Sequence, residues 1–348
     1  MSNFSGLCLG VALSLSAGVV LAQQPSAPPP SEAQQQQQRQ ITQPGNNAPV
    51  WRDVRSGQEN YTSIKGRETG VLIQSAGETW RQIRNGPVTF YGGLLVVLIA
   101  AAILGFYSIF GPVKLHGKPT GRLIQRFTRL DQVVHWSVAI SFCILGLGGL
   151  IMLFGKHVLL PVIGYTLFGW LTALSKNLHN FVAPIFIVSV AAMIVLYVRH
   201  NLPKAYDLKF LLGAFDVMAR GKHIASGKFN GGEKVWFWGG VVVLSVVVTW
   251  SGLILLFPNF DQTRAVMQEA WIWHACAGLL YISISFGHMY LGTIGLDGSY
   301  QAMRTGYVDE TWAKEHHQYW YDEMKASARQ PAGGGAVPAG APHAEEKS

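Results

Sequence analysis

The sequence predicts an all-α integral membrane protein with five transmembrane helices. Hydrophobic residues make up 49% of the 348 residues and charged residues only 13%, which is typical of a polytopic membrane protein. Five apolar runs reach the roughly twenty residues that a helix needs to cross the hydrocarbon core. A sixth run, 158–174, is shorter and contains Pro161 and Gly164, so we expect an interfacial or re-entrant segment there.

The first part of the chain is expected outside the membrane. Residues 1–22 have the apolar stretch and small terminal residues of a secretory signal peptide, but no Lys or Arg, so an uncleaved anchor is the alternative. Residues 23–50 are rich in Gln, Pro and Ala and bury too little apolar surface to fold. With the mixed segment 51–87 they make an outer extension, 23–87, that is partly disordered and packs on a partner or on the membrane surface.

The five spans follow in order at 90–110, 133–154, 177–198, 235–257 and 270–296. Their orientation follows from the basic residues, which mark cytoplasmic loops. The loop 111–132 carries Lys114, Lys118, Arg122, Arg126 and Arg129. The loop 199–234 carries Arg199, Lys204, Lys209, Arg220, Lys222, Lys228 and Lys234. Both loops are therefore expected on the cytoplasmic side.

The other loops contain few basic residues, as expected for the outer face. Only Lys156 and Lys176 fall in 155–176, and only Arg264 falls in 258–269. Five helices with an outer N-terminus fit this pattern. A sixth span at 158–174 would invert the orientation of all later spans and loops. Arg81 and Arg84 precede the first span on the outside, although basic residues are usually cytoplasmic. A segment that follows a signal peptide can be translocated despite such charges.

Two further segments are expected at the cytoplasmic surface. Apolar residues recur at helical spacing in the loop 199–234 and predict a helix lying on the membrane or, alternatively, packed on a partner; they are Leu208, Leu211, Leu212, Phe215 and Met218. Residues 326–348 are rich in Ala, Gly and Pro and predict a disordered tail.

The last apolar run carries two imidazoles, His274 and His288, and no other ionisable group that is charged near neutral pH. They are fourteen residues apart, which places them within roughly 40° of one another and about 21 Å apart along a helix. Placing an ionisable group within a membrane span costs free energy, so such a group suggests a functional role. Neutral imidazole is a common metal ligand. We therefore expect two metal centres at two depths.

Each imidazole needs a partner at its own depth on a neighbouring helix. His179 lies near the outer end of the third span and His135 near the inner end of the second. The only pairing consistent with depth is His179 with His274 on the outer side and His135 with His288 on the inner side. The chain has no C-x-x-C-H motif, so a haem here would be of b type, held by axial ligands rather than by thioether bonds.

Two other interpretations of the histidines remain open. A single intramembrane histidine often has a hydrogen-bonded structural role, and a set of histidines can form the proton relay of a coupled transporter. The histidines of the loops and tails are expected to be solvated, although His316 and His317 could face a quinone or a proton path. Nucleic-acid binding is not expected, because the basic residues are spread between apolar runs.

Residues 127–321 closely resemble the cytochrome b (gamma) subunit of membrane-bound, periplasm-facing formate dehydrogenases. The resemblance rests on FTRLDQVVHW, LHNFVAPIFIV, YVRHNLP, KFNGGEKVWFW, WHACAGLLYISISFGHMY and WAKEHHQYWY. It implies a four-helix dihaem domain, 127–325, preceded by an extra transmembrane helix, 88–111. The signal, the extension, this extra helix and the GETWRQIRNGPV stretch depart from the short form of the family and are similar to its longer members.

The resemblance also implies a function. In the family four histidines bind two b haems, and they match His135 and His288 for the inner haem and His179 and His274 for the outer haem. The quinone site would use Asn230, Gly232 and His288. An iron–sulfur (beta) subunit would deliver electrons from a molybdenum- or tungsten-containing catalytic (alpha) subunit, across a bacterial inner membrane with the mature N-terminus periplasmic and the C-terminus cytoplasmic. The nearest alternative is the cytochrome b subunit of a nickel–iron hydrogenase.

Overall fold

The computed structural model describes residues 31, 34, 38, 55, 56 and 76–329. Residues 76–329 belong to one compact unit of the chain. The expected signal peptide, 1–22, lies outside the described residues. So do most of the expected extension, 23–87, and the tail beyond residue 329.

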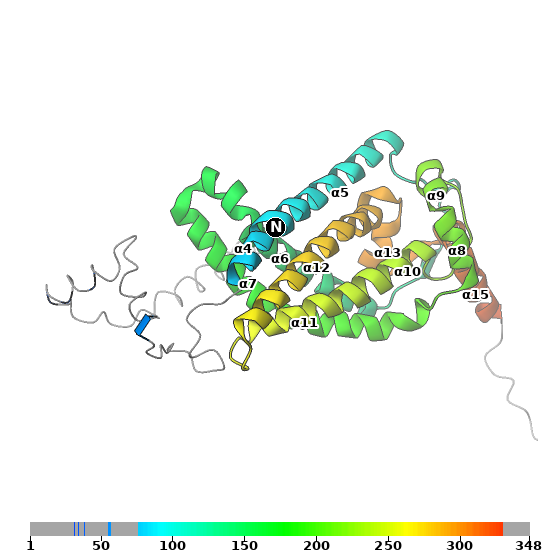
Figure 1. The fold of residues 1–348 in the computed structure, drawn as a ribbon. Helices are drawn as coiled ribbons and strands as arrows, with labels where there is room; N and C mark the ends of the chain where they lie inside the picture. Colours follow the sequence, from blue (N-terminus) through cyan, green and yellow to red (C-terminus); the bar gives the residue numbers. More distant parts are fainter. Residues whose placement is uncertain (1–30, 32–33, 35–37, 39–54, 57–75, 330–348) are drawn as a thin grey trace, which may run out of the picture. The chain divides into compact units, whose positions relative to one another are not determined.

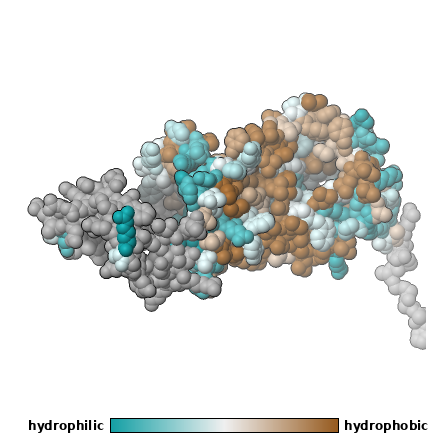
Figure 2. Space-filling view, in the orientation of Figure 1, coloured by the Kyte–Doolittle hydropathy of each residue, from teal (hydrophilic) through white to brown (hydrophobic). Residues whose placement is uncertain are grey.

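Within residues 76–329, five helical segments are long and apolar enough to cross a membrane. They confirm the five predicted spans. They are Gly77–Phe110, Arg129–Val158, Leu160–His200, Gly231–Leu256 and Arg264–Gly295. Figure 2 shows an apolar surface over these helices, with hydrophilic residues toward the end that carries the short helices. Exposed Leu, Val and Phe side chains are stable on such a surface only against lipid.

The first span begins earlier than predicted. Helix α4 (Gly77–Ile83), a π-helical turn (Arg84–Val88) and α5 (Thr89–Phe110) follow one another without a break. Residues 77–87 are therefore part of this helix rather than of the extension. Pro87 has no N–H to donate, and the π turn accommodates it within the helix. In Figure 1 α5 runs beside the fifth span.

Helices α6 (Arg129–Val158) and α7 (Leu160–Tyr197) form a long hairpin. A capping box starts α6, in which the Thr128 side chain accepts from the Asp131 N–H and the Asp131 carboxylate accepts from the Thr128 N–H. Gly164 has φ 75°, a conformation that glycine adopts without strain, and it kinks the start of α7. The run 158–174 is thus the first part of α7, where the Phe168 ring packs against Gly155, and it adds no sixth span.

The fourth and fifth spans each contain a π-helical stretch. The fourth consists of α10 (Gly231–Trp236), a π segment (Phe237–Leu244) and α11 (Ser245–Leu256). The fifth consists of α12 (Arg264–Tyr290) and a π turn (Leu291–Gly295). Extensive contacts join α11 to α12 and α12 to α5. The buried bundle core between the spans includes Val138, Phe186, Val190, Met193, Phe237, Val241 and Tyr281.

The two basic loops and the C-terminal segment fold together into what we call the loop layer, residues 111–128, 198–230 and 296–329. Its elements are β1 (Leu123–Gln125), a 3-10 turn (Val198–His200), α8 (Ala205–Leu212), α9 (Ala214–Arg220), α13 (Ser299–Thr305), β2 (Tyr307–Asp309), α14 (Glu310–His316) and α15 (Gln318–Arg329). Strands β1 and β2 are antiparallel, with Leu123 opposite Asp309. The layer has its own buried core, which includes Phe127, Val308, Trp312, Trp320 and Tyr321.

The loop layer corrects two predictions in detail. The single surface helix expected in 199–234 is two helices, α8 and α9, separated at Gly213, with Leu208, Leu212 and Phe215 exposed. The expected disordered tail, 326–348, overlaps α15, which continues to Arg329. Burial of Trp320 and Tyr321 in the layer fixes the start of α15, and helix propagation from a formed turn is favourable.

Candidate functional site

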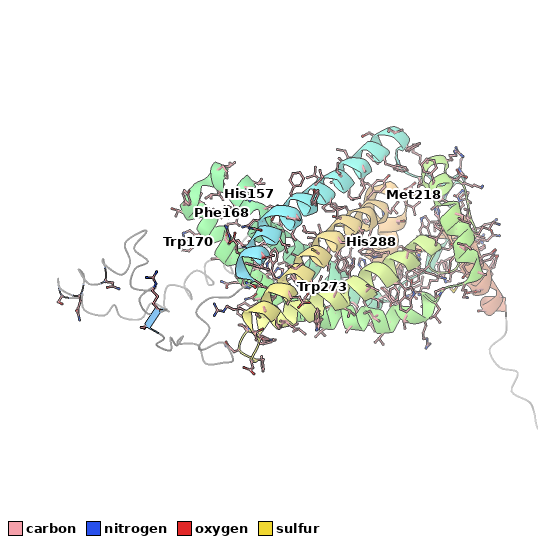
Figure 3. The ribbon with its side chains drawn as sticks, viewed as in Figure 1. His157, Phe168, Trp170, Met218, Trp273 and His288 are labelled. Carbon is pink, nitrogen blue, oxygen red and sulfur yellow. The ribbon has the colours of Figure 1, made fainter. Side chains whose placement is uncertain are left out.

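Helix α12 presents His274 and His288 to two different neighbours. Figure 3 shows Trp273, next to His274, and His288 at separate positions along α12. His274 faces His179 of α7, and His288 faces His135 of α6. We call these the outer pair and the inner pair, after the predicted topology. By accessible surface His288 is exposed and the other three imidazoles are half-buried, so each ring leaves surface free for a ligand.

The outer pair is His179 and His274, whose ring centroids are 6.0 Å apart. The His179 Nδ1 donates to the Leu145 carbonyl at 3.1 Å, and the His274 Nδ1 donates to the Val248 carbonyl at 3.0 Å. Ser251 Oγ lies 3.2 Å from the His274 Nδ1. A proton held on Nδ1 in this way leaves the Nε2 lone pair available to a metal.

The inner pair is His135 and His288, with ring centroids 6.2 Å apart. The Trp236 indole stacks on the His288 ring at 4.9 Å and 12°. The His135 Nδ1 is buried and has no hydrogen-bond partner within the described protein. Because a buried polar atom without a partner is costly, this nitrogen indicates that a group beyond the described residues completes the site.

The spacing of both pairs would suit two imidazole ligands of one metal ion. A metal–imidazole bond is about 2.0–2.1 Å long, so two rings on opposite sides of an ion have centroids about 6 Å apart. Direct hydrogen bonding between two imidazoles would bring the rings closer. The donor set of two neutral imidazoles is one that haem iron accepts.

A cavity of about 390 Å³ surrounds the outer pair, within the range of about 300–1,000 Å³ that holds cofactors. Its walls are mainly apolar, and glycines from three helices, Gly149, Gly252 and Gly278, line it. A Cβ at Gly278 would meet no atom within 4 Å, whereas one at Gly252 would lie 3.1 Å from the His274 ring. Small residues thus keep the space beside the imidazoles open, as a flat, mainly apolar cofactor would require.

The sequence matches a family model described as prokaryotic cytochrome b561, over residues 126–306. The chain belongs to this cytochrome b family. Membership implies b-type haem, and it agrees with the two imidazole pairs that lie within the matched region. The four-helix part of the fold, α6 to α12, is the cytochrome b domain, and the helix Gly77–Phe110 precedes it.

Curated relatives confirm the resemblance to formate dehydrogenase cytochrome b subunits. The cytochrome b556(Fdn) subunit of the nitrate-inducible formate dehydrogenase of Escherichia coli K12 is 31% identical over 219 residues, which are 60% of this chain and 95% of that protein. The cytochrome b556(fdo) subunit from the same strain is 28% identical over 212 residues, 60% of this chain and 97% of that protein. The Haemophilus influenzae subunit is 25% identical over 203 residues, 55% and 79% of the two chains.

The quinone-site candidates lie at the start of α10. Asn230 is the N-cap, with its Oδ1 accepting from the Glu233 N–H at 2.9 Å, and the Glu233 carboxylate accepts from the Asn230 N–H at 2.8 Å. Gly232 is exposed. Trp236, one turn further along the same helix, reaches His288. Gly232 is therefore one helical turn from Trp236, the residue that contacts the inner pair.

Sequence reasoning missed several residues around these sites. Trp236 stacks on His288, and nothing in the spacing of this tryptophan along the sequence indicates the stack. His317 was expected to be solvated but is 1% exposed, with its Nδ1 donating to the Gly227 carbonyl at 2.7 Å. Burial, with His223 adding to the effect, lowers the pKa of neighbouring His316 to about 4, so this ring is neutral at neutral pH.

A second cluster of potential ligands lies in the loop layer. His116, His223 and Glu315 hold three ligand atoms within 4.8 Å of one another and could bind a metal ion. A hydrogen bond between His223 Nε2 and His116 Nδ1 already pairs the two rings, and His223 Nδ1 donates to the Glu315 carbonyl at 3.1 Å. The cluster thus links three segments that are far apart in the sequence.

Proposed function

We propose that this chain is the dihaem membrane anchor of a formate dehydrogenase, which passes electrons from outside the membrane to a quinone. One observation carries the proposal: two histidine pairs with ring centroids 6.0 and 6.2 Å apart share α12. Their positions on α12, fourteen residues apart, correspond to about 21 Å along the helix axis. This separation is consistent with one centre toward each face of the membrane.

The four imidazoles would hold two b haems, His179 and His274 the outer one and His135 and His288 the inner one. Bound haem supplies reversible one-electron transfer. The protein sets the ligand geometry: Leu145 and Val248 carbonyls fix the rings of the outer pair, and Trp236 fixes the ring of His288. Outer contacts of this kind hold ligands in orientation and tune the metal.

The electron donor would be an iron–sulfur subunit on the outer side, itself supplied by a molybdenum- or tungsten-containing catalytic subunit. Support comes from the relatives, which are named as cytochrome b556 subunits of formate dehydrogenases. Formate oxidation would then belong to another subunit, and this chain would carry electrons from the outer pair to the inner pair. A nickel–iron hydrogenase would be the alternative donor complex.

The electron acceptor would be a quinone bound beside the inner pair, near Asn230, Gly232 and His288. The Asn230 Oδ1 is occupied as a helix cap, so Asn230 would act through its amide Nδ2 or by setting the turn that leaves Gly232 open. Quinone reduction on this side would take protons from the cytoplasm. Charge would therefore be separated across the membrane.

The orientation follows the positive-inside rule. Both basic loops belong to the loop layer, so the two segments expected in the cytoplasm lie at the same end of the spans. The layer and the C-terminus would face the cytoplasm of a bacterial inner membrane, and the mature N-terminus would face the periplasm. The part of the expected extension that precedes the helix Gly77–Phe110 would then meet the periplasmic subunits.

Purification of the native complex tests this proposal. We expect co-purifying iron–sulfur and catalytic subunits and formate-dependent reduction of a membrane quinone. The His288→Ala variant of the complex should still oxidise formate with a soluble dye as electron acceptor but should fail to reduce quinone. Hydrogen-dependent quinone reduction by the same preparation, without formate activity, would instead support the hydrogenase alternative. A complex that contains no haem would contradict both.

A further inference from the structure

An arginine of the GETWRQIRNGPV segment lies at the cavity of the outer pair. The Arg84 guanidinium carbon is 5.1 Å from the Trp271 ring of α12 and 5.5 Å from the Trp80 ring of α4. The two indoles meet edge to face at 5.7 Å. Cation–π contacts on two sides hold the side chain in place, and the same side chain lines the cavity with His179 and His274.

One nitrogen of the Arg84 guanidinium lacks a hydrogen-bond partner among the described residues. Its Nε is buried and has no hydrogen-bond partner within the described residues. Arg81, three residues earlier, is instead exposed and donates twice to Glu78 at 2.8 Å. A buried guanidinium nitrogen without an acceptor is costly, so the conformation of Arg84 indicates an acceptor beyond the described residues.

The charge around the cavity shows which kind of acceptor fits. Two of the residues that line the cavity are basic, Arg84 and Lys176, and none of the described residues that line it is acidic. The Lys176 Nζ donates to the Asn180 side chain at 3.2 Å, which leaves further donor capacity. An apolar cavity lined by two cations and by no carboxylate among the described residues suits a flat, mainly apolar ligand that carries an anionic group.

We propose that Arg84 binds a carboxylate of the ligand in this cavity, which is a propionate of the outer haem if the proposed function is correct. The planar guanidinium matches a carboxylate with two parallel hydrogen bonds. The π turn that begins at Arg84 is a feature often found at functional sites. Arg84 lies outside the region 126–306 that matches the family model, so the added N-terminal helix completes the cofactor site of the cytochrome b domain.

This contact has an electrostatic consequence. Reduction adds an electron to the haem, and a nearby fixed cation stabilises the reduced form. Removing the charge of Arg84 should lower the ratio of reduced to oxidised outer haem at a fixed potential by about tenfold, as expected for one charge about 10 Å away at an effective dielectric constant of about 20. The inner haem, about 21 Å further along α12, should change by only about threefold at the same dielectric constant.

The test is a spectroelectrochemical titration of the full chain, purified as wild type, Arg84→Gln, Arg84→Lys and Arg81→Gln. The His288→Ala variant, which is expected to keep only the outer haem, identifies the outer component. We expect the Arg84→Gln variant to lower the ratio of reduced to oxidised outer haem at a fixed potential about tenfold or to lose that haem alone. The Arg84→Lys variant should recover most of the loss, and Arg81→Gln should match the wild type.

Three results would overturn the inference on Arg84. They are an Arg84→Gln titration that matches the wild type, an equal change in Arg81→Gln, and loss of both haems together from Arg84→Gln. A wild-type chain without two b-type components is a different result, because it contradicts the proposed function itself. The inner haem serves throughout as the internal check that each variant is folded.

Discussion

The Trp236 indole lies nearly parallel to the His288 imidazole, with ring centroids 4.9 Å apart and an interplanar angle of 12°. Trp236 belongs to the fourth span and His288 to the fifth, so the stack joins the end of α10 to the inner pair. Tyr281, seven residues before His288, contacts the same indole at 5.8 Å and the Ser245 hydroxyl at 3.0 Å. The indole thus holds the His288 ring from one side.

Replacing Trp236 with Leu should weaken binding of the inner haem, because the His288 ring loses its fixed plane. Loss of a group that orients a metal ligand typically costs about 10–100-fold in affinity. Haem retention during dilution of the purified chain measures the effect. Trp236→Phe should keep most of the affinity, and Trp250→Leu, at an exposed position of α11, is the control. An unchanged inner haem in Trp236→Leu would contradict this role.

Gly278→Leu should remove the outer haem, because the new side chain grows into the cavity that Gly278 lines. A Cβ at this position meets no atom within 4 Å, so the fold itself should tolerate the change. The haem to protein ratio should fall from two to one. Gly105→Leu, on α5 and equally free of neighbours, should keep both haems. Retention of both haems by the Gly278 variant would show that the cavity is not the haem site.

A buried ion pair ties the loop layer to the fourth span. Lys234 Nζ lies 2.8 Å from Asp207 Oδ2, with the two side chains 5% and 10% exposed. Lys234→Met should leave the Asp207 carboxylate buried without a counter-charge, at a cost of about 3–5 kcal/mol. Thermal unfolding in detergent should show the loss. The exposed Lys222→Met variant, which breaks a 3.8 Å pair with Asp216, should change stability by less than about 0.5 kcal/mol.

Asp309 makes the loop layer sensitive to acid. Its burial tends to raise the pKa, but hydrogen bonds from the Thr311, Thr120 and Gly121 backbone outweigh this, and the net pKa of Asp309 lies below its ordinary value of 3.8. A carboxylate whose pKa is lower in the folded than in the unfolded protein stabilises the fold fully at pH values above its unfolded-state pKa. This stabilisation is lost as the pH falls through the folded-state pKa.

Amide exchange at Thr120 and Gly121 should therefore be faster in Asp309→Asn than in the wild type above about pH 4, and the difference should disappear as the pH falls further. The ratio of the two rates at each pH removes the intrinsic pH dependence of exchange. A ratio that stays constant down to pH 2 would mean that the Asp309 charge does not hold this turn.

The spans could be predicted from sequence because lipid imposes a simple requirement of about twenty apolar residues. The partners of His274 and His288 could be predicted from depth, and His179 and His135 are the imidazoles that face them. The loop layer could not be predicted from the sequence, because it is built from contacts between residues far apart in the chain. One example is Ser226 Oγ, which donates to the His316 carbonyl at 2.7 Å.

Aromatic and cationic contacts were also beyond sequence reasoning. Tryptophans near the ends of spans are typical membrane-interface residues. Only the tertiary structure shows that Trp236 contacts His288 and that Trp80 and Trp271 contact Arg84. The helix 77–87 was missed for a different reason. Pro87 and three charged residues, Glu78, Arg81 and Arg84, argue against a membrane helix locally, and the contact with α12 outweighs them.

The most direct test of the central claim is a reduced-minus-oxidised spectrum of the purified chain beside its His288→Ala and His274→Ala variants. We predict a split b-type α band in the wild type, with one component missing from His288→Ala and the other missing from His274→Ala. His135→Ala should match the first variant and His179→Ala the second. Full retention of both components in all four variants, or a colourless wild type, would contradict the assignment of two haems to these two pairs.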